Sequence, residues 1–395
     1  MSRIKPRAVL ATIFIALIAS GPALAELPRH VRLQTWQPLP EEQSLPPLFE
    51  DLPNEFGFDL AIRNGLAFVG MPLTMSTGQV AVFTQGTKGV WTRTATIIAS
   101  DRTSGDEFGR AVSFRNGLVV VGSARAAYVF KQVDGVWREQ QKIVRLVSDG
   151  GVFFARGLKQ EAGVLAIRNE AAVYIFERGT TGKFERRARF APPAGKRWFG
   201  NSISMTKREI VFGSPPAAYI LGRNSSGQWI RQQRLVPLHP DPGGGFGETV
   251  AIDNDMILVA DRNAVPADPD SAGIVYGFVP SQGKYVEAFQ LSQPDEWPAT
   301  RFGVSIAMFG TRFAVGATEF DDDGGETPNR AFVATYSRDG SVVRPLGFVQ
   351  HSTVPTSIGI ANNVMLVGSP LTGFCVFGAD CIGEANLYDL SRFEP

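Results

Sequence analysis

Residues 108–130 read FGRAVSFRNGLVVVGSARAAYVF, and this stretch decides the fold. After the opening Phe-Gly pair, apolar residues alternate with small or polar ones at Val112 and Phe114, as in a half-buried strand. The Asn116-Gly117 pair is typical of a two-residue hairpin turn, in which both residues take a positive φ. The apolar runs LVVVG and AAYVF then predict a second and a third strand that are covered on both faces.

The same pattern returns along the chain every 45–56 residues. Each unit opens on a large apolar residue, and these residues are Phe56, Phe108, Phe154, Phe199, Phe246, Phe302 and Val354. After the third strand a Gly-x-aromatic step leads into a more polar segment, such as WREQQKIV at 137–144, which suits the outer edge of a sheet. A period near fifty residues indicates a repeat architecture.

Each unit therefore predicts a four-stranded antiparallel sheet that cannot bury both of its faces alone. Seven such sheets stacked around an axis cover one another, so the sequence predicts an all-β, seven-bladed β-propeller with the opening residues packed between blades. The seventh unit ends without a fourth strand. Residues 32–39, RLQTWQPL, match the fourth strand of unit four, RQQRLVPL, at four positions. We therefore expect this N-terminal segment to supply the missing edge strand and close the ring.

The N-terminal sequence predicts export. Basic residues precede an apolar run from Ala8 to Ser20, and Ala23-Leu24-Ala25 fits the small-residue rule for signal-peptide cleavage, although an uncleaved anchor is the alternative. No second long apolar run follows, so the mature chain is expected in the periplasm or outside the cell, without a membrane span. In that compartment Cys375 and Cys381 are expected to form a disulfide, and two unpaired thiols are the alternative.

The formal net charge of the chain is only +1, which does not suggest a surface that neutralises nucleic-acid phosphates. We expect the protein to be a monomer, and the features above divide its chain into three parts. The three parts are a signal peptide (1–25), a closing strand with its linker (26–55) and the propeller (56–395).

The opening stretch resembles an FG-GAP repeat, and Gly213-Ser214-Pro215 and Gly368-Ser369-Pro370 stand where that family has Gly-Ala-Pro. From about residue 30 onward the chain is similar to the propeller of integrin α-subunits and of bacterial secreted FG-GAP proteins. The resemblance implies that partners bind on one face. Many FG-GAP repeats place a calcium loop between the first two strands. Here only Asp253-Asn254-Asp255 holds two carboxylates in that turn, so no cofactor is predicted there.

The longest connections between second and third strands belong to units five and six, and acidic residues gather in them and in the link between these units. We expect them on the face that carries the links between blades. The candidates for partner binding are Asp268, Asp270, Asp295, Glu296, Trp297, Asp321, Asp322, Asp323 and Glu326. Of these, Asp321, Asp322 and Asp323 are also the candidates for calcium. The alternative is that these loops are simply solvated and keep the protein soluble.

The three histidines, His30, His239 and His351, stand in no pattern typical of a catalytic triad or a metal site. The sequence therefore predicts a non-catalytic, exported binding or adhesion propeller that recognises a protein or a surface glycan through the long-loop face. One alternative is a secreted hydrolase with acidic residues in a pocket on that face. Another is a carbohydrate-binding propeller with Trp198 and Trp297 as aromatic platforms.

Unit three departs most from the pattern. Ala155 replaces the glycine that follows the opening phenylalanine, and Arg168-Asn169-Glu170 replaces Gly-Ser-Pro. The sequence leaves two explanations open: this blade has drifted, or it makes a special contact.

Overall fold

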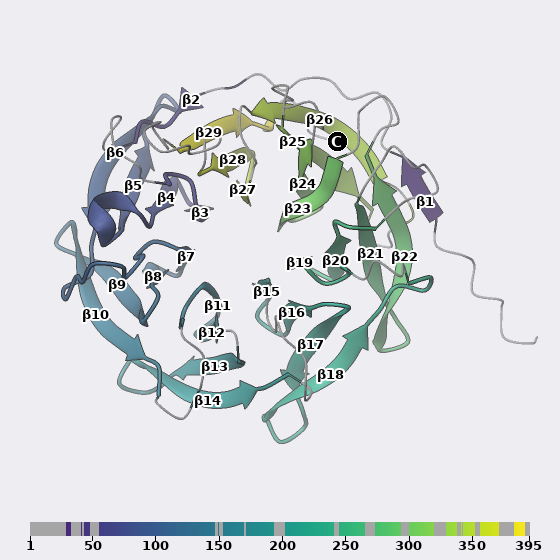
Figure 1. The fold of residues 1–395 in the computed structure, drawn as a ribbon, viewed down its shortest axis with the longest axis horizontal. Helices are drawn as coiled ribbons and strands as arrows, with labels where there is room; N and C mark the ends of the chain where they lie inside the picture. Colours follow the sequence, from purple (N-terminus) through teal and green to yellow (C-terminus); the bar gives the residue numbers. More distant parts are fainter. Residues whose placement is uncertain are drawn as a thin grey trace, which may run out of the picture.

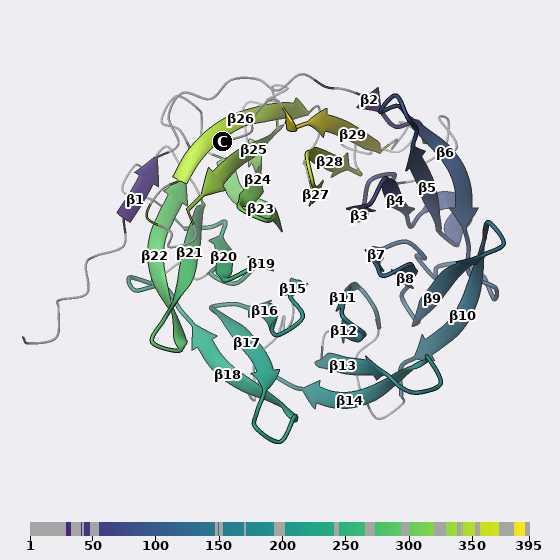
Figure 2. The same ribbon diagram turned by 180° about the vertical axis from the view of Figure 1, so that it is seen from behind.

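The chain forms seven sheets of antiparallel strands arranged in a ring, which confirms the predicted seven-bladed β-propeller (Figure 1). The structure is a computed structural model, and it describes residues 29–32, 41, 43–47, 55–146, 149, 153–169, 171–192, 202–240, 245–264, 273–293, 300–319, 329–337, 341, 343–351, 356–370 and 383–391. The first strand of each blade lies nearest the axis, and the fourth lies on the outside of the ring, as both views show (Figures 1 and 2).

Blades one to four each consist of four strands that are consecutive in the sequence. Blade one contains β3 (Leu60–Arg63), β4 (Leu66–Met71), β5 (Gln79–Gln85) and β6 (Trp91–Ile97). Blade two contains β7 (Ala111–Arg115), β8 (Leu118–Gly122), β9 (Ala126–Val133) and β10 (Val136–Val144). Blade three contains β11 (Gly157–Glu161), β12 (Val164–Arg168), β13 (Val173–Arg178) and β14 (Phe184–Phe190). Blade four contains β15 (Ile203–Met205), β16 (Ile210–Ser214), β17 (Ala217–Arg223) and β18 (Trp229–Leu235).

Blade six also consists of four consecutive strands, whereas blades five and seven each include a strand from the N-terminal part of the chain. Blade five contains β19 (Thr249–Asp253), β20 (Met256–Asp261), β21 (Ile274–Ser281) and β22 (Lys284–Ser292), with β1 (Arg29–Arg32) added outside. Blade six contains β23 (Thr300–Phe309), β24 (Arg312–Glu319), β25 (Asn329–Tyr336) and β26 (Val343–His351). Blade seven contains β27 (Ser357–Ala361), β28 (Val364–Ser369), β29 (Glu384–Asp389) and β2 (Gln43–Ser44). A short 3-10 helix, η1 (Thr74–Ser76), lies between β4 and β5.

The apolar core is divided among the contacts between blades. Among the described residues, buried apolar side chains form seven clusters, and each cluster joins two neighbouring blades. Phe108, which opens the second unit, is fully buried in the cluster between blades one and two, with its ring 5.4 Å from that of Tyr128. Truncating such a side chain to alanine costs about 3–5 kcal/mol. The predicted place of these phenylalanines is therefore confirmed wherever the structure describes them.

The glycine after the opening phenylalanine allows the blades to approach closely. Gly109 has a φ of 100°, and its carbonyl lies against Gly70 of blade one, where a Cβ atom would overlap it. At Gly109 itself a Cβ atom would collide with the carbonyl of Gln79. The contact between blades one and two thus needs a glycine on both sides.

The end of the ring differs from the sequence prediction. The fourth strand of blade seven is β2, whose Gln43 and Ser44 pair antiparallel with Leu387 and Asn386 of β29. The predicted closing strand, residues 32–39, is not confirmed. Arg32 instead belongs to β1, which pairs in parallel with β22 of blade five, and residues 33–40 lie outside the described part of the chain.

Glutamine side chains fasten some of the outer strands together. The amide of Gln141 on β10 accepts a hydrogen bond from the backbone N–H of Phe184 (2.7 Å) and donates one to the carbonyl of the same residue (2.8 Å). Gln233 makes the same pair of bonds to Tyr285, and Gln43 makes it to Trp91. We call this arrangement the glutamine clasp; it joins blades two and three, four and five, and seven and one.

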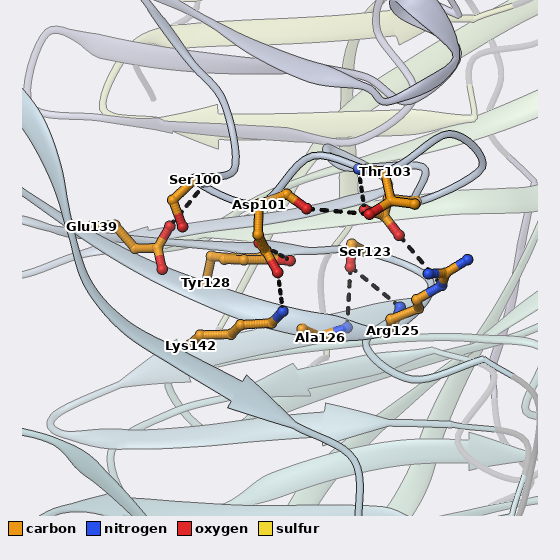
Figure 3. A network of polar contacts seen from close by, with 10 residues as sticks. Ser100, Asp101, Thr103, Ser123, Arg125, Ala126, Tyr128, Glu139 and Lys142 are labelled. Atoms are coloured by element: carbon orange, nitrogen blue, oxygen red, sulfur yellow. Dashed lines mark hydrogen bonds and ion pairs between the residues drawn. The ribbon is translucent and has the colours of Figure 1, made fainter.

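A polar network holds the link between blades one and two (Figure 3). The hydroxyl of Tyr128 donates a hydrogen bond to Asp101 Oδ1 (3.0 Å), and Lys142 forms an ion pair with the other carboxylate oxygen. Lys142 lowers the pKa of Asp101 most strongly, and Tyr128 adds to this effect. Burial and the bond to Asp101 raise the pKa of Tyr128, so this phenol stays protonated and remains a donor.

Candidate functional site

The inner strands enclose a cavity of about 410 Å³ at the face where they begin. We call this cavity the channel mouth and that face the mouth face. Residues that directly follow the Phe-Gly position of their repeats, such as Phe58, Arg110 and Glu248, line it. The volume lies within the range that small-ligand sites occupy in proteins.

Basic side chains dominate the charge of the mouth. Five cations line it: Arg110, Arg156, Lys159, Arg168 and Arg262. The carboxylates that line it are Asp59 and Glu248. The mouth therefore carries a positive excess, in contrast to the acidic site that the loops suggested.

Two of the cations are neutralised by neighbouring carboxylates. Arg262 forms an ion pair with Glu248. Arg110 Nη1 lies 2.8 Å from Glu107 Oε2 and also faces Glu55. Burial raises the pKa of Glu55, and the repulsion of Glu107 adds to this, while Arg110 opposes it. In blade three, Arg156 and Lys159 have no such pairing, because none of the described carboxylates lies within ion-pair distance of either side chain.

Blade three places an arginine where most of the other blades have a glycine. Arg168 on β12 pairs in register with Gly157 on β11. The corresponding pair in blade two is Gly122 and Ala111. A Cβ atom at Gly157 would lie 2.6 Å from Arg168 Nε, so the glycine makes room for the larger side chain. This exchange answers the question that unit three raised: its departures from the repeat bring cations to the mouth.

Lys159 stands between the mouth and the rest of the channel. It lines both the mouth and a second cavity of about 200 Å³, whose wall combines apolar side chains such as Ile252 and Met308 with the polar side chains of Arg63 and Ser113. The strand that carries Lys159 is fixed by its neighbour Gln160, which is buried and donates hydrogen bonds to Ser113 O (2.8 Å) and Leu118 O (2.9 Å) of blade two.

Polar side chains on the inner strands reach across to the backbone of the next blade. These contacts run from Asp59 to Val112, Ser113 to Gln160, Ser202 to Val250, Ser204 to Ile252, Thr249 to Val304 and Ser357 to Gly57. They set the inner strands against one another, so the mouth is formed before any ligand arrives. They also engage both oxygens of Asp59, which accept hydrogen bonds from Val112 N (2.7 Å) and Leu60 N (2.9 Å).

The loop residues predicted to bind a partner all lie outside the described residues. This holds for Asp268, Asp270, Asp295, Glu296, Trp297, Asp321, Asp322, Asp323 and Glu326, for Trp198, and for the predicted disulfide partners Cys375 and Cys381. Asp261, at the start of the blade-five loop, is buried, and its carboxylate accepts a hydrogen bond from Asn263 N (3.2 Å). His239 is exposed.

The acidic turn of blade five serves as a contact between blades. Asp253 accepts a hydrogen bond from Gly310 N (2.7 Å), and Asn254 donates one to Gly310 O (3.0 Å). Within the described ranges there is no group of three or more His, Cys, Asp and Glu side chains placed to hold a metal ion. The same ranges contain no helix with the length and apolar character needed to cross a membrane.

The cations of the mouth were missed because they come from separate repeats and stand in predicted strands. One signal was present: in ARGLKQE, residues 155–161, a lysine stands at the position where the inner strands of the other units have alanine, serine or glycine. An unexplained charge in a strand that faces an axis indicates either a buried pair or a site for an ion.

Comparison with known proteins agrees with this fold. The sequence model of the FG-GAP repeat matches residues 91–130, which run from β6 of blade one to β9 of blade two. This match, together with the seven blades, confirms the predicted resemblance to an FG-GAP propeller. No curated protein matches the sequence.

Solved structures share the fold at very low sequence identity. U3-55K has a TM-score of 0.52 at 7% identity, over 88% of this chain and 98% of that one. The WD40 repeats of RRP9 have a TM-score of 0.55 at 7% identity, over 90% and 100%. A protein from Lactobacillus plantarum has a TM-score of 0.53 at 10% identity, over 76% and 87%. At these identities the likeness concerns the fold alone.

Proposed function

We propose that the protein is a non-catalytic binding propeller, exported as a monomer, that recognises a protein or a surface glycan through its mouth face. The observation that carries this proposal is that the channel mouth opens on the face where the long loops of blades five and six begin. Arg262, directly after β20, lines the mouth, and the blade-five loop at 265–272 follows it closely. In blade six, Glu319 ends β24 directly before the loop at 320–328.

Two further points support a binding role. Propellers that contain FG-GAP repeats are generally non-enzymatic. In addition, both carboxylates that line the mouth are engaged, Asp59 by two backbone N–H groups and Glu248 by Arg262. Hydrolysis of a glycosidic bond needs two carboxyl groups set across the substrate, and nothing in the described mouth favours the hydrolase alternative.

The experiment is a retention assay with the immobilised mature protein and envelope or culture material. We expect the protein to retain a component of this material, and a variant with residues 265–272 and 320–328 each shortened to Gly-Gly to lose it. Treating the material beforehand with protease or with periodate distinguishes a protein partner from a glycan. The control replaces Thr180 and Thr181, exposed in the β13–β14 turn on the opposite face, with alanine.

Equal retention by the native protein and the shortened variant contradicts the proposal, because the long-loop face would then make no contribution. Retention lost in the control alone places binding on the opposite face and contradicts it as well. Circular dichroism of each variant shows whether the ring has remained folded.

A further inference from the structure

We propose that the channel mouth binds a small oxyanion, a carboxylate or phosphate group, held by Arg156 and Lys159 of blade three. This inference rests on the proposed function, because it names the chemistry of the group that the mouth face takes up.

The first argument concerns charge that has no partner. Arg110 and Arg262 each have a carboxylate beside them, whereas no described carboxylate lies within ion-pair distance of Arg156 or Lys159. The Arg156 guanidinium lies 3.5 Å from the centroid of the Phe153 ring, and its Nε–H is buried without a hydrogen-bond acceptor. A donor left without a partner costs free energy that an anion would recover.

The second argument concerns the donors that surround the same space. The cavity of about 410 Å³ has room for one small polar molecule, and Thr356 lines it as well as the cations. Guanidinium groups match the planar geometry of carboxylates and phosphates, and an ammonium group adds a point charge. Of the two lining carboxylates, Glu248 is paired with Arg262, and Asp59 belongs to blade one, so neither belongs to blade three.

The third argument concerns how the residues of blade three differ from those at the equivalent positions of the other blades. At the position of Arg156, blade two also has an arginine, Arg110. The position of Lys159 is the one at which blade three differs from every other blade, where the corresponding residues are Ala61, Ser113, Ser204, Ala251, Ala307 and Gly359. Placing a lysine on a strand that faces the channel costs desolvation unless an opposite charge is nearby. A ligand anion supplies that charge, which explains why the third repeat departs from the others where its side chains face the mouth.

Isothermal titration calorimetry with inorganic phosphate and with D-glucuronate tests the proposal, using the full mature protein. D-glucose and sodium chloride at matched ionic strength are the neutral and non-specific controls. We expect saturable binding of phosphate, glucuronate or both. Lys159→Met and Arg156→Gln should each weaken it by about 10- to 100-fold, the range for hydrogen bonds to charged groups. Lys131→Met, which removes an exposed lysine on β9, should leave it unchanged.

Binding of phosphate alone assigns a phosphate ligand, and binding of glucuronate alone assigns a carboxylate. No saturable binding of either anion, or equal affinity in Lys159→Met, Arg156→Gln and the native protein, overturns the inference. The loop-shortened protein separates the two proposals: it should lose the envelope component and keep the anion. If the native protein retains the envelope component through its long loops but binds neither anion, only the oxyanion site is overturned. If the native protein binds the anion but the loop-shortened variant retains the component equally well, only the loop surface is overturned.

Discussion

The carboxylate of Asp101 connects the link between blades one and two with Tyr128 of β9 and Lys142 of β10. Its protonation should therefore change the free energy of unfolding of the whole ring. Lys142 and Tyr128 both bind the charged form, so the pKa of Asp101 in the folded protein lies below its ordinary value of 3.8. A lowered pKa stabilises the fold at pH values above the ordinary pKa, and the contribution disappears as the pH falls through the lower, folded value.

We therefore expect Asp101→Asn to reduce the free energy of unfolding by less than about 1 kcal/mol near neutral pH, because the pair is largely exposed. The difference from the native protein should begin to shrink as the pH falls below about 4 and vanish below the lowered pKa of Asp101 in the folded protein. Urea unfolding measured from pH 7 to pH 2 gives both values. For Lys142→Met, the difference in the free energy of unfolding from the native protein should disappear over the same acidic pH range. A difference that stays constant down to pH 2 would contradict this account of Asp101.

Between elements, the glutamine clasp shows how a side chain can extend a sheet into the next blade. Each clasp satisfies one backbone N–H and one carbonyl at the start of the neighbouring outer strand. Gln141 reaches Phe184 from a position directly after the β-bulge of β10, where the register shifts between Glu139 and Gln141. The bulge increases the twist of the strand and leaves Gln140 as the unpaired residue of the ladder.

Two adjacent glutamines therefore give a matched test. Gln141→Ala should lower the free energy of unfolding by about 1–3 kcal/mol, because it leaves two polar groups of Phe184 without partners. Gln140→Ala should change it by less than about 0.5 kcal/mol, because Gln140 bonds only to carbonyls of its own strand. The midpoints of urea unfolding compare the two variants. Equal effects would show that the clasp contributes nothing to stability.

The sequence predicted these elements better than it predicted their connections. Alternation, Asn-Gly turns and apolar runs depend on neighbouring residues, so the strands could be placed from local pattern alone, and Asn116-Gly117 takes the expected positive φ angles of 50° and 74°. The channel mouth depends on residues from different repeats that meet only at the axis. Its positive charge at Arg156, Lys159 and Arg168 becomes visible only once the blades are arranged in a ring.

For the whole molecule, the closing strand was misplaced because two segments match the same target equally well. Residues 41–48, EEQSLPPL, share four positions with RQQRLVPL, as do residues 32–39. Both segments have a glutamine, Gln34 or Gln43, at the clasp position of Gln233, so this position does not distinguish them. They differ at the position of Leu235, where the second segment has Leu45, with only 1% of its surface exposed, and the first has Trp36.

Two truncated chains test which segment the ring requires. A chain that begins at Glu41 keeps Gln43 and Leu45 and loses only the pairing of β1 with the outside of blade five. A chain that begins at Phe49 loses the clasp to Trp91 and the burial of Leu45 against Leu366 and Leu387. We expect the first to unfold like the native protein and the second to lose roughly 3–5 kcal/mol, as for deletion of a large core side chain.

Thermal and urea unfolding of both chains measure this difference, and the edge left open in the second chain should also make it self-associate. If the chain beginning at Glu41 is destabilised as much as the one beginning at Phe49, then the segment before residue 41 holds the ring together and β2 does not. If neither chain is destabilised, contacts between blades suffice without an edge strand on β29. If only the chain beginning at Phe49 is destabilised, the β2–β29 pair closes the ring.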